Sequence, residues 1–109
     1  MELEELQKIV DEFIKEIGGY WEDSIILARC IEELGEIAHV LQLLKGFRPI
    51  PKEDSSIDFE AELELEIGDL LFVLISLANK RNINLEETLL SVIEKYRRRD
   101  LSKWKKILK

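Results

Sequence analysis

The chain has 109 residues, of which 46% are hydrophobic and 36% are charged, and its formal net charge is −7. This composition is typical of one globular domain, spanning residues 1–109, and argues against a disordered chain. No window reaches the roughly 18 uncharged apolar residues of a membrane span, and because the N-terminus is acidic we expect no secretory signal peptide. Because the lone Cys30 cannot form an internal disulfide, we expect a cytoplasmic protein.

The first half of the chain predicts two helices. Apolar residues recur at helical spacing over about residues 2–17, and Gly18-Gly19 ends this first helix. A second helix runs over about residues 22–45, with Asp23 or Ser24 as its cap.

The second half predicts a loop followed by two more helices. The loop 46–57 contains both prolines, and Ser55 or Ser56 near its end can cap a third helix that extends to about residue 81. Asn84, with Glu87 three residues later, begins a fourth helix that ends near residue 99. With no strand alternation anywhere, the pattern predicts an all-α fold, a four-helix bundle.

The second predicted helix is apolar on two sides. Glu32 and Glu36 fall almost opposite its main apolar stripe, Glu33 lies at the side of that stripe, and Ile25 and Leu43 share the opposite side. Because such a helix needs cover on both sides, we expect another subunit to supply a second layer, so that oligomerisation completes the bundle. The stripe expected to face the core consists of Leu27, Cys30, Ile31, Leu34, Ile37, Ala38, Leu41 and Leu44.

The fourth predicted helix carries an apolar face and ends in a basic segment. From Glu94 to Lys109, eight Lys or Arg residues accompany two acids, which leaves a local charge of +6. Such a segment suits an anionic ligand, and it equally suits a solvated helix end whose cations complement the helix dipole. We expect the last ten residues to form a final turn or short helix. The residues expected to point inward are Leu85, Leu89, Val92, Ile93 and Tyr96.

Four carboxylates are the candidate functional groups. Glu33 and Glu36 are three residues apart on the second helix, and Glu66 and Asp69 have the same spacing within a largely apolar stretch of the third. If the two helices pack antiparallel, these acids converge on a volume the size of a hydrated cation. Hard oxygen ligands favour Mg²⁺ or Mn²⁺. The alternative is a helix surface of salt bridges, which does not explain acids within an apolar stretch.

Other kinds of site find less support. Glu36 and His39 form a Glu-x-x-His unit, the element of carboxylate di-iron bundles. Such bundles need the unit twice and His39 is the only histidine, although a symmetric dimer could supply a second copy. Nucleophilic catalysis is disfavoured because Cys30 lies on the predicted core stripe. Glycine-rich phosphate loops and paired zinc cysteines are absent.

The ordered motifs EELGE at residues 32–36 and EIGD at residues 66–69 resemble the EExxE…ExxD signature of the MazG-type, all-α nucleoside triphosphate pyrophosphohydrolases. The similarity covers nearly the whole chain, since GYW at 19–21, LANKRNINLEE at 77–87 and KYRRRDLSKW at 95–104 also look like short single-domain members. The resemblance implies Mg²⁺-dependent hydrolysis of a nucleoside triphosphate to a monophosphate and pyrophosphate, with Mn²⁺ as a substitute metal.

Carried over by position, the resemblance implies that Glu33, Glu36, Glu66 and Asp69 hold the metal. Glu32 would be an outer ligand or the base that activates water, so the acids assigned to catalysis are Glu32, Glu33 and Glu36.

The substrate contacts expected from the resemblance are less uniform. Lys95 and Arg99, one turn apart, would bind phosphate oxygens, with a solvated helix end as the alternative. Tyr96 stands where many relatives have Asn, and Trp21 is either an aromatic wall for a base or hinge packing. The segment between Glu36 and Glu66 is long for the signature. Such folds are usually dimers or tetramers, so a homo-oligomer is expected.

Two further function classes stay open. The chain could be a non-catalytic helical interaction module whose acids are structural, or a carboxylate-bridged di-metal bundle. Nucleic-acid binding through the basic tail is the weakest alternative, and a steep salt dependence would be its signature.

Overall fold

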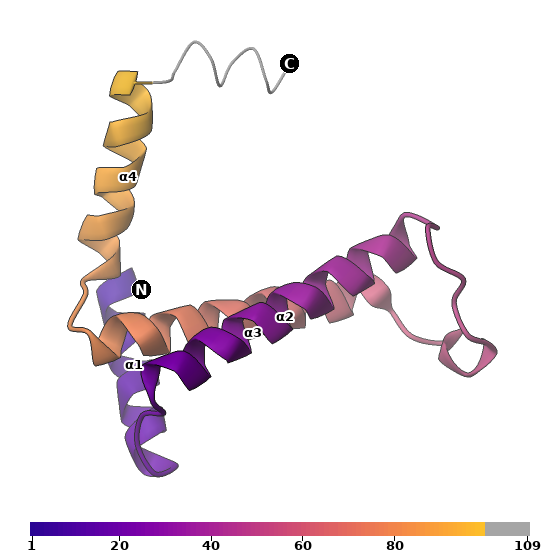
Figure 1. Ribbon diagram of the computed structural model, residues 1–109, viewed down its shortest axis with the longest axis horizontal. Helices are drawn as coiled ribbons and strands as arrows, with labels where there is room; N and C mark the ends of the chain where they lie inside the picture. The colour runs from indigo at the N-terminus through magenta and orange to yellow at the C-terminus, as the bar shows by residue number, and fades with distance from the viewer. Residues whose placement is uncertain (100–109) are drawn as a thin grey trace.

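A computed structural model describes residues 1–99, and it contains four α-helices and one short 3₁₀ turn (Figure 1). The helices are α1 (Leu3–Glu16), α2 (Asp23–Leu44), α3 (Phe59–Lys80) and α4 (Leu85–Arg99), and the turn η1 (Lys52–Asp54) lies in the loop between α2 and α3. Residues 1–99 form no strand. The predicted all-α, four-helix fold is therefore confirmed, while the expected final turn at 100–109 lies outside the described residues.

Side-chain caps define where three of the helices begin. Asn84 Oδ1 accepts a hydrogen bond from the Glu87 backbone N–H at 3.1 Å, which confirms the cap predicted for α4. The other two predicted caps are wrong. Glu22 caps α2 in place of Asp23 or Ser24, and Asp58 caps α3 in place of the serines at 55 and 56. Ser55 ends the η1 turn at residues 52–54, and α3 begins only after Asp58.

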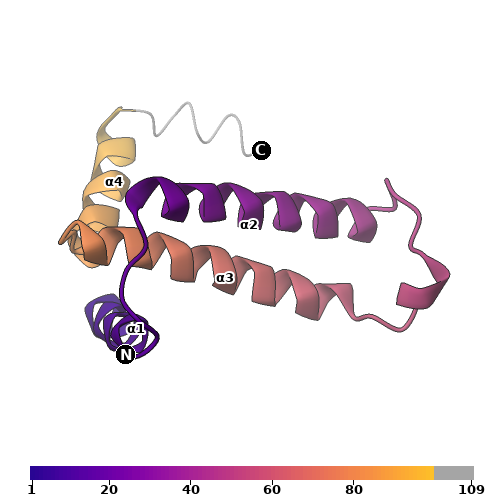
Figure 2. The ribbon, with the colours of Figure 1, turned by 60° about the horizontal axis from the view of Figure 1, so that its bottom comes forward.

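Helices α2 and α3 form an antiparallel hairpin along the length of the molecule (Figure 2). The buried side of α2 carries Ile26, Val40 and Leu43, and the buried residues of α3 include Val73 and Ile75. Helix α1 crosses the C-terminal half of α3, where Ile14 is buried. There the Phe13 and Phe72 rings meet edge to face, with their centroids 6.0 Å apart.

The predicted core stripe of α2 is wrong within a single chain. Leu27, Ile31 and Leu34 are exposed by 54%, 64% and 58%. The adjacent stripe that contains Ile26 and Glu33 faces α3 instead. Helical periodicity cannot choose between two neighbouring apolar stripes, and the hairpin buries the one that includes a carboxylate. The predicted stripe with Leu27, Ile31 and Leu34 is left exposed to solvent.

The inward face predicted for α4 is also wrong. No residue of α4 is buried, and Leu89 is 53% exposed. Figure 1 shows α4 rising away from the end of the α2–α3 hairpin, and α4 contacts α1. The amphipathic pattern of α4 therefore marks a face that residues 1–99 cover only in part, with Leu85 and Val92 half-buried.

Buried Gln7 of α1 ties the junction between α3 and α4. Its Nε2 donates to Asn79 Oδ1 at 2.9 Å and to the Ile83 carbonyl at 2.8 Å, while its Oε1 accepts from the Leu85 backbone N–H at 2.9 Å. The side chain thus satisfies backbone groups on both sides of the turn that sets the direction of α4. None of the helices within residues 1–99 has the length and apolar character that crossing a membrane requires.

Candidate metal centre

Three carboxylates from the hairpin converge on one point. One oxygen each of Glu33 on α2 and of Glu66 and Asp69 on α3 lie within 4.8 Å of one another. Glu33 is 7% exposed, Glu66 is half-buried and Asp69 is exposed, so the group opens toward solvent on the Asp69 side. We call these three residues the carboxylate cluster. The antiparallel packing of two helices that each present acids creates it.

Within the cluster, Glu66 is the carboxyl whose pKa is shifted by its surroundings. Burial raises the pKa of its carboxyl above the ordinary value of 4.5, and the hydrogen bond and charge of Glu33 raise it further. The charges of Asp69 and Glu36 act in the same direction. Proximity of like charges thus favours a protonated Glu66 unless a cation compensates the group.

The donor set of the cluster fits a hard divalent cation. Carboxylate oxygens are the ligands that Mg²⁺ and Mn²⁺ prefer, and two ligands on one helix with a third on its neighbour give a fixed geometry. Glu36 acts on Glu66 through its charge but lies outside the three-residue group. Glu32 occupies the exposed flank of α2, also outside the group. Exposed His39 lies beside Arg48, with 3.3 Å between Nδ1 and Nη1, and the described residues do not bring it into the cluster.

Arg29 is a cation at the cluster that was not expected from the sequence. Its Nη2 forms an ion pair with Glu33 Oε1 at 2.9 Å, one turn earlier on α2. The i, i+4 spacing between Arg29 and Glu33 was the available signal, since such pairs lie on one helix face. What the spacing could not show is that Glu33 is buried at that point.

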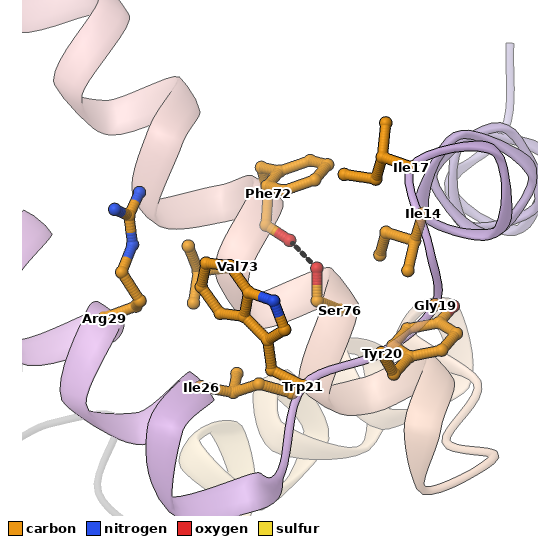
Figure 3. A pocket seen from close by; sticks show the side chains of 10 residues that line it. All are labelled: Ile14, Ile17, Gly19, Tyr20, Trp21, Ile26, Arg29, Phe72, Val73 and Ser76. Carbon is orange, nitrogen blue, oxygen red and sulfur yellow. Dashed lines mark hydrogen bonds between the residues drawn. The ribbon is translucent and has the colours of Figure 1, made fainter.

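An aromatic pocket of about 100 Å³ lies beside Arg29, between α1, α2 and α3 (Figure 3). Figure 3 shows Arg29 at one end and Tyr20 at the other, with the Trp21 ring between them. The Trp21 carbonyl accepts a hydrogen bond from Lys80 Nζ at 2.6 Å, which anchors the linker to the end of α3. The lining residues are Ile14, Ile17, Gly19, Tyr20, Trp21, Ile26, Arg29, Phe72, Val73 and Ser76.

The polar groups of this aromatic pocket are largely engaged by the protein. The Tyr20 hydroxyl donates to Asp11, and the Ser76 hydroxyl donates to the Phe72 carbonyl at 2.9 Å. Arg29 differs, because its Nε is buried and has no hydrogen-bond partner within residues 1–99. The pocket therefore offers apolar and aromatic surface with one unmet cationic donor.

The expected substrate contacts on α4 lie apart from the cluster. Lys95, Tyr96 and Arg99 belong to α4, which contributes no member of the three-carboxylate group and stands away from the hairpin. The Lys95 ammonium lies 5.0 Å from the centre of the Tyr96 ring. Trp21, by contrast, lines the aromatic pocket next to Arg29.

The fold and the cluster together define a helical protein with a carboxylate centre suited to a divalent cation. Comparisons with known proteins narrow this class. A family model for the MazG nucleotide pyrophosphohydrolase domain matches residues 22–104. The uncharacterised protein YpjD of Bacillus subtilis is 36% identical over 103 residues, which span 94% of this chain and 89% of YpjD.

Two solved structures share this fold. The crystal structure of YpjD from Bacillus subtilis gives a TM-score of 0.77 at 36% identity, covering 88% of this chain and 95% of that one. The crystal structure of a Bacillus-conserved MazG protein, a nucleotide pyrophosphohydrolase, gives a TM-score of 0.73 at 32% identity. The match covers 88% of this chain and 90% of that one. The chain belongs to the MazG nucleotide pyrophosphohydrolase family, which confirms the resemblance drawn from the sequence motifs.

Proposed function

We propose that this protein is a Mg²⁺-dependent nucleoside triphosphate pyrophosphohydrolase that releases a monophosphate and pyrophosphate. The observation that carries the proposal is the convergence of Glu33, Glu66 and Asp69 within 4.8 Å in a chain of this family. One buried, one half-buried and one exposed acid at this distance repel one another without a cation, and a bound divalent metal would compensate their charge.

In this proposal, Glu33, Glu66 and Asp69 hold Mg²⁺, or Mn²⁺ as a substitute, with Glu36 available at the edge of the group. The bound cation would neutralise the triphosphate and lower the pKa of a coordinated water. Glu32 and Glu36 lie one turn apart on α2 and are the acids available to accept the proton of the attacking water or to serve as outer ligands. Lys95, Arg99 and Tyr96 lie on α4, apart from the cluster within one chain, and remain proposed substrate contacts only.

The aromatic pocket is the proposed site for the base. Trp21 offers a ring for stacking, and Arg29 lies between this pocket and Glu33. The hydroxyl groups of Tyr20 and Ser76 already donate hydrogen bonds within the protein. The pocket would therefore recognise a base by its shape more than by hydrogen bonds. Canonical, deoxy and non-canonical triphosphates all belong in a first substrate panel.

We also propose a homo-oligomer. The uncovered faces of α2 and α4 carry Ile31, Leu34 and Leu89, each more than half exposed. Contiguous apolar faces of this kind mark interaction surfaces. A second copy of the chain would supply the missing cover.

The decisive experiment is to incubate the protein with canonical and modified nucleoside triphosphates, with and without Mg²⁺, and to identify the products. We expect metal-dependent monophosphate and pyrophosphate. Glu66→Gln should lower the rate at least about 100-fold, since a metal centre supplies several kcal/mol to the transition state. Glu64→Gln, an exposed acid two residues earlier on α3, is the matched control and should keep the activity.

Other outcomes would redirect the proposal. Diphosphate and orthophosphate would retain a nucleotide hydrolase but move the cleaved bond. If the protein showed no turnover and did not bind Mg²⁺, the result would favour the helical interaction module.

A further inference from the structure

Arg29 joins the two parts of the proposed active site. Its Nη2 is paired with Glu33 of the carboxylate cluster at 2.9 Å, and its side chain forms one end of the aromatic pocket (Figure 3). The Arg29 side chain is 42% exposed, so it is reachable from solvent as well as from the pocket. A ligand that extends from the pocket to the cluster has to pass this guanidinium.

The hydrogen bonds of Arg29 are only partly used. In a guanidinium, the Nε–H and one Nη2–H point in the same direction and form an edge that matches two oxygens of a carboxylate or phosphate. Glu33 accepts from Nη2, whereas Nε is buried and lacks a partner among residues 1–99. Half of this edge is therefore unsatisfied, although it is the part of the side chain best suited to an anion.

The charge of Arg29 has opposite effects in two states of the site. Without a metal, it compensates part of the negative charge of Glu33, Glu66 and Asp69. If Glu33 held a divalent cation, the neighbouring guanidinium would be repelled and would have to share its carboxylate. A phosphate oxygen of the substrate would give Arg29 a replacement partner.

We propose that Arg29 exchanges partners and is a substrate-binding residue: it pairs with Glu33 in the metal-free protein and binds the base-proximal phosphate of the nucleotide when Glu33 holds the metal. The inference rests on the proposed function, because it takes a nucleotide as the anion. Arg29 thereby couples occupation of the aromatic pocket to occupation of the carboxylate cluster.

The test measures two affinities by calorimetry, for Mg²⁺ alone and for a triphosphate with a methylene bridge between the α and β phosphorus atoms in Mg²⁺. Arg29→Gln should bind Mg²⁺ about threefold to tenfold more tightly, because a competing cation has gone. It should bind the analogue about tenfold or more weakly, because a charge-assisted contact is lost. A residue that only supports the fold would weaken both affinities together.

Two further variants sharpen the result. Arg29→Lys keeps the charge but lacks the two-donor edge, so we expect wild-type Mg²⁺ affinity with weakened analogue binding. Lys15→Gln removes a cation from an i, i+4 pair with Asp11 on α1, at 2.8 Å, and should leave both affinities within about twofold of the wild type. Melting temperatures of all variants identify any loss of folded protein.

The proposal is overturned if Arg29→Gln binds Mg²⁺ less tightly than the wild type, or if it binds the analogue equally well. A wild-type protein that binds Mg²⁺ but not the analogue would overturn it as well. Failure of the proposed reaction looks different: the wild type would bind the analogue with the expected Arg29 dependence yet hydrolyse no triphosphate.

Discussion

At the scale of single residues, Glu66 carries the clearest electrostatic signature of the site. Its pKa is raised by burial and by Glu33, so the folded protein binds this proton more tightly than the unfolded chain does. The resulting contribution to stability is fully present below the ordinary pKa of 4.5 and is lost as the pH rises through the folded pKa. A metal-free site at neutral pH is therefore under strain from like charges.

The raised pKa of Glu66 predicts how the stability of Glu66→Gln depends on pH. Without metal, the melting temperature of the variant should rise relative to the wild type as the pH increases from about 4 to 7, because the variant has no proton to lose at residue 66. Thermal unfolding in a chelator at several pH values measures this difference. Glu64→Gln should track the wild type at every pH, and Mg²⁺ should restore stability to the wild type more than to Glu66→Gln. A wild-type-to-variant difference that does not change with pH would contradict the assignment.

The sequence predicted the members of the cluster better than their surroundings. The i, i+3 spacing of Glu66 and Asp69 fixes them on one face of α3, so their convergence with Glu33 needed only an antiparallel partner. Arg29 and Phe72 could not be assigned in the same way. Their roles depend on which stripe of α2 faces α3 and on where α1 crosses, and both are properties of tertiary packing.

At the scale of elements, the position of α4 depends on one side chain of α1. Gln7 is 8% exposed and satisfies Asn79 Oδ1, the Ile83 carbonyl and the Leu85 N–H. The Asn79 side chain returns a hydrogen bond to the Gln7 carbonyl at 2.9 Å. Because no residue of α4 is fully buried, these polar contacts add to limited apolar packing in holding the helix.

We therefore expect Gln7→Leu to destabilise the protein by about 2–4 kcal/mol, since it removes all the hydrogen bonds of a buried side chain and leaves their partly buried partners unpaired while keeping similar volume. Urea denaturation measures the change in the free energy of unfolding. Gln42→Leu is the matched control, because the Gln42 amide makes no side-chain hydrogen bond within residues 1–99, and it should change stability by less than about 1 kcal/mol. Equal losses in the two variants would argue against the role of the Gln7 contacts.

The elements themselves were predictable, but their buried faces were not. Apolar periodicity, the positions of glycine and proline, and cap residues together placed all four helices within a few residues of their observed bounds. On α2 two neighbouring stripes are apolar, and on α4 the apolar face is covered only in part within the described chain. A pattern shows that a face needs cover without showing which surface provides it.

At the scale of the whole molecule, a single chain leaves an unusual amount of surface uncovered. Its radius of gyration is 17.4 Å, whereas a compact domain of this length has about 13 Å. Its accessible surface is 8650 Å², compared with about 6,300 Å² for a folded monomer of the same mass. The excess exceeds the roughly 1,600 Å² that a standard protein–protein interface buries in total, so a second copy has room to make a stable contact.

The same surface makes the oligomer testable. Ile31 and Leu34 lie on the uncovered stripe of α2, three residues apart and exposed by 64% and 58%. We expect the wild type to have a mass at least twice that of the 12.8 kDa chain, measured by light scattering after size-exclusion chromatography. Placing Lys at both positions should shift the mass toward that of a single chain, because two charges cannot be buried in an apolar contact without partners. Ser56→Lys, in the exposed loop 46–57, adds a charge away from this face and should leave the mass unchanged.

Helicity separates loss of contact from loss of folding. The doubly substituted chain should keep its α2–α3 hairpin, since neither substituted side chain is among those buried against α3. A wild type that is monomeric at high concentration would contradict the proposed oligomer. A variant that stays oligomeric would place the contact elsewhere, for example on the face of α4 that carries Leu89 and Leu90. Because the carboxylate cluster forms within one chain, Mg²⁺ binding should survive in a doubly substituted variant whose mass has fallen.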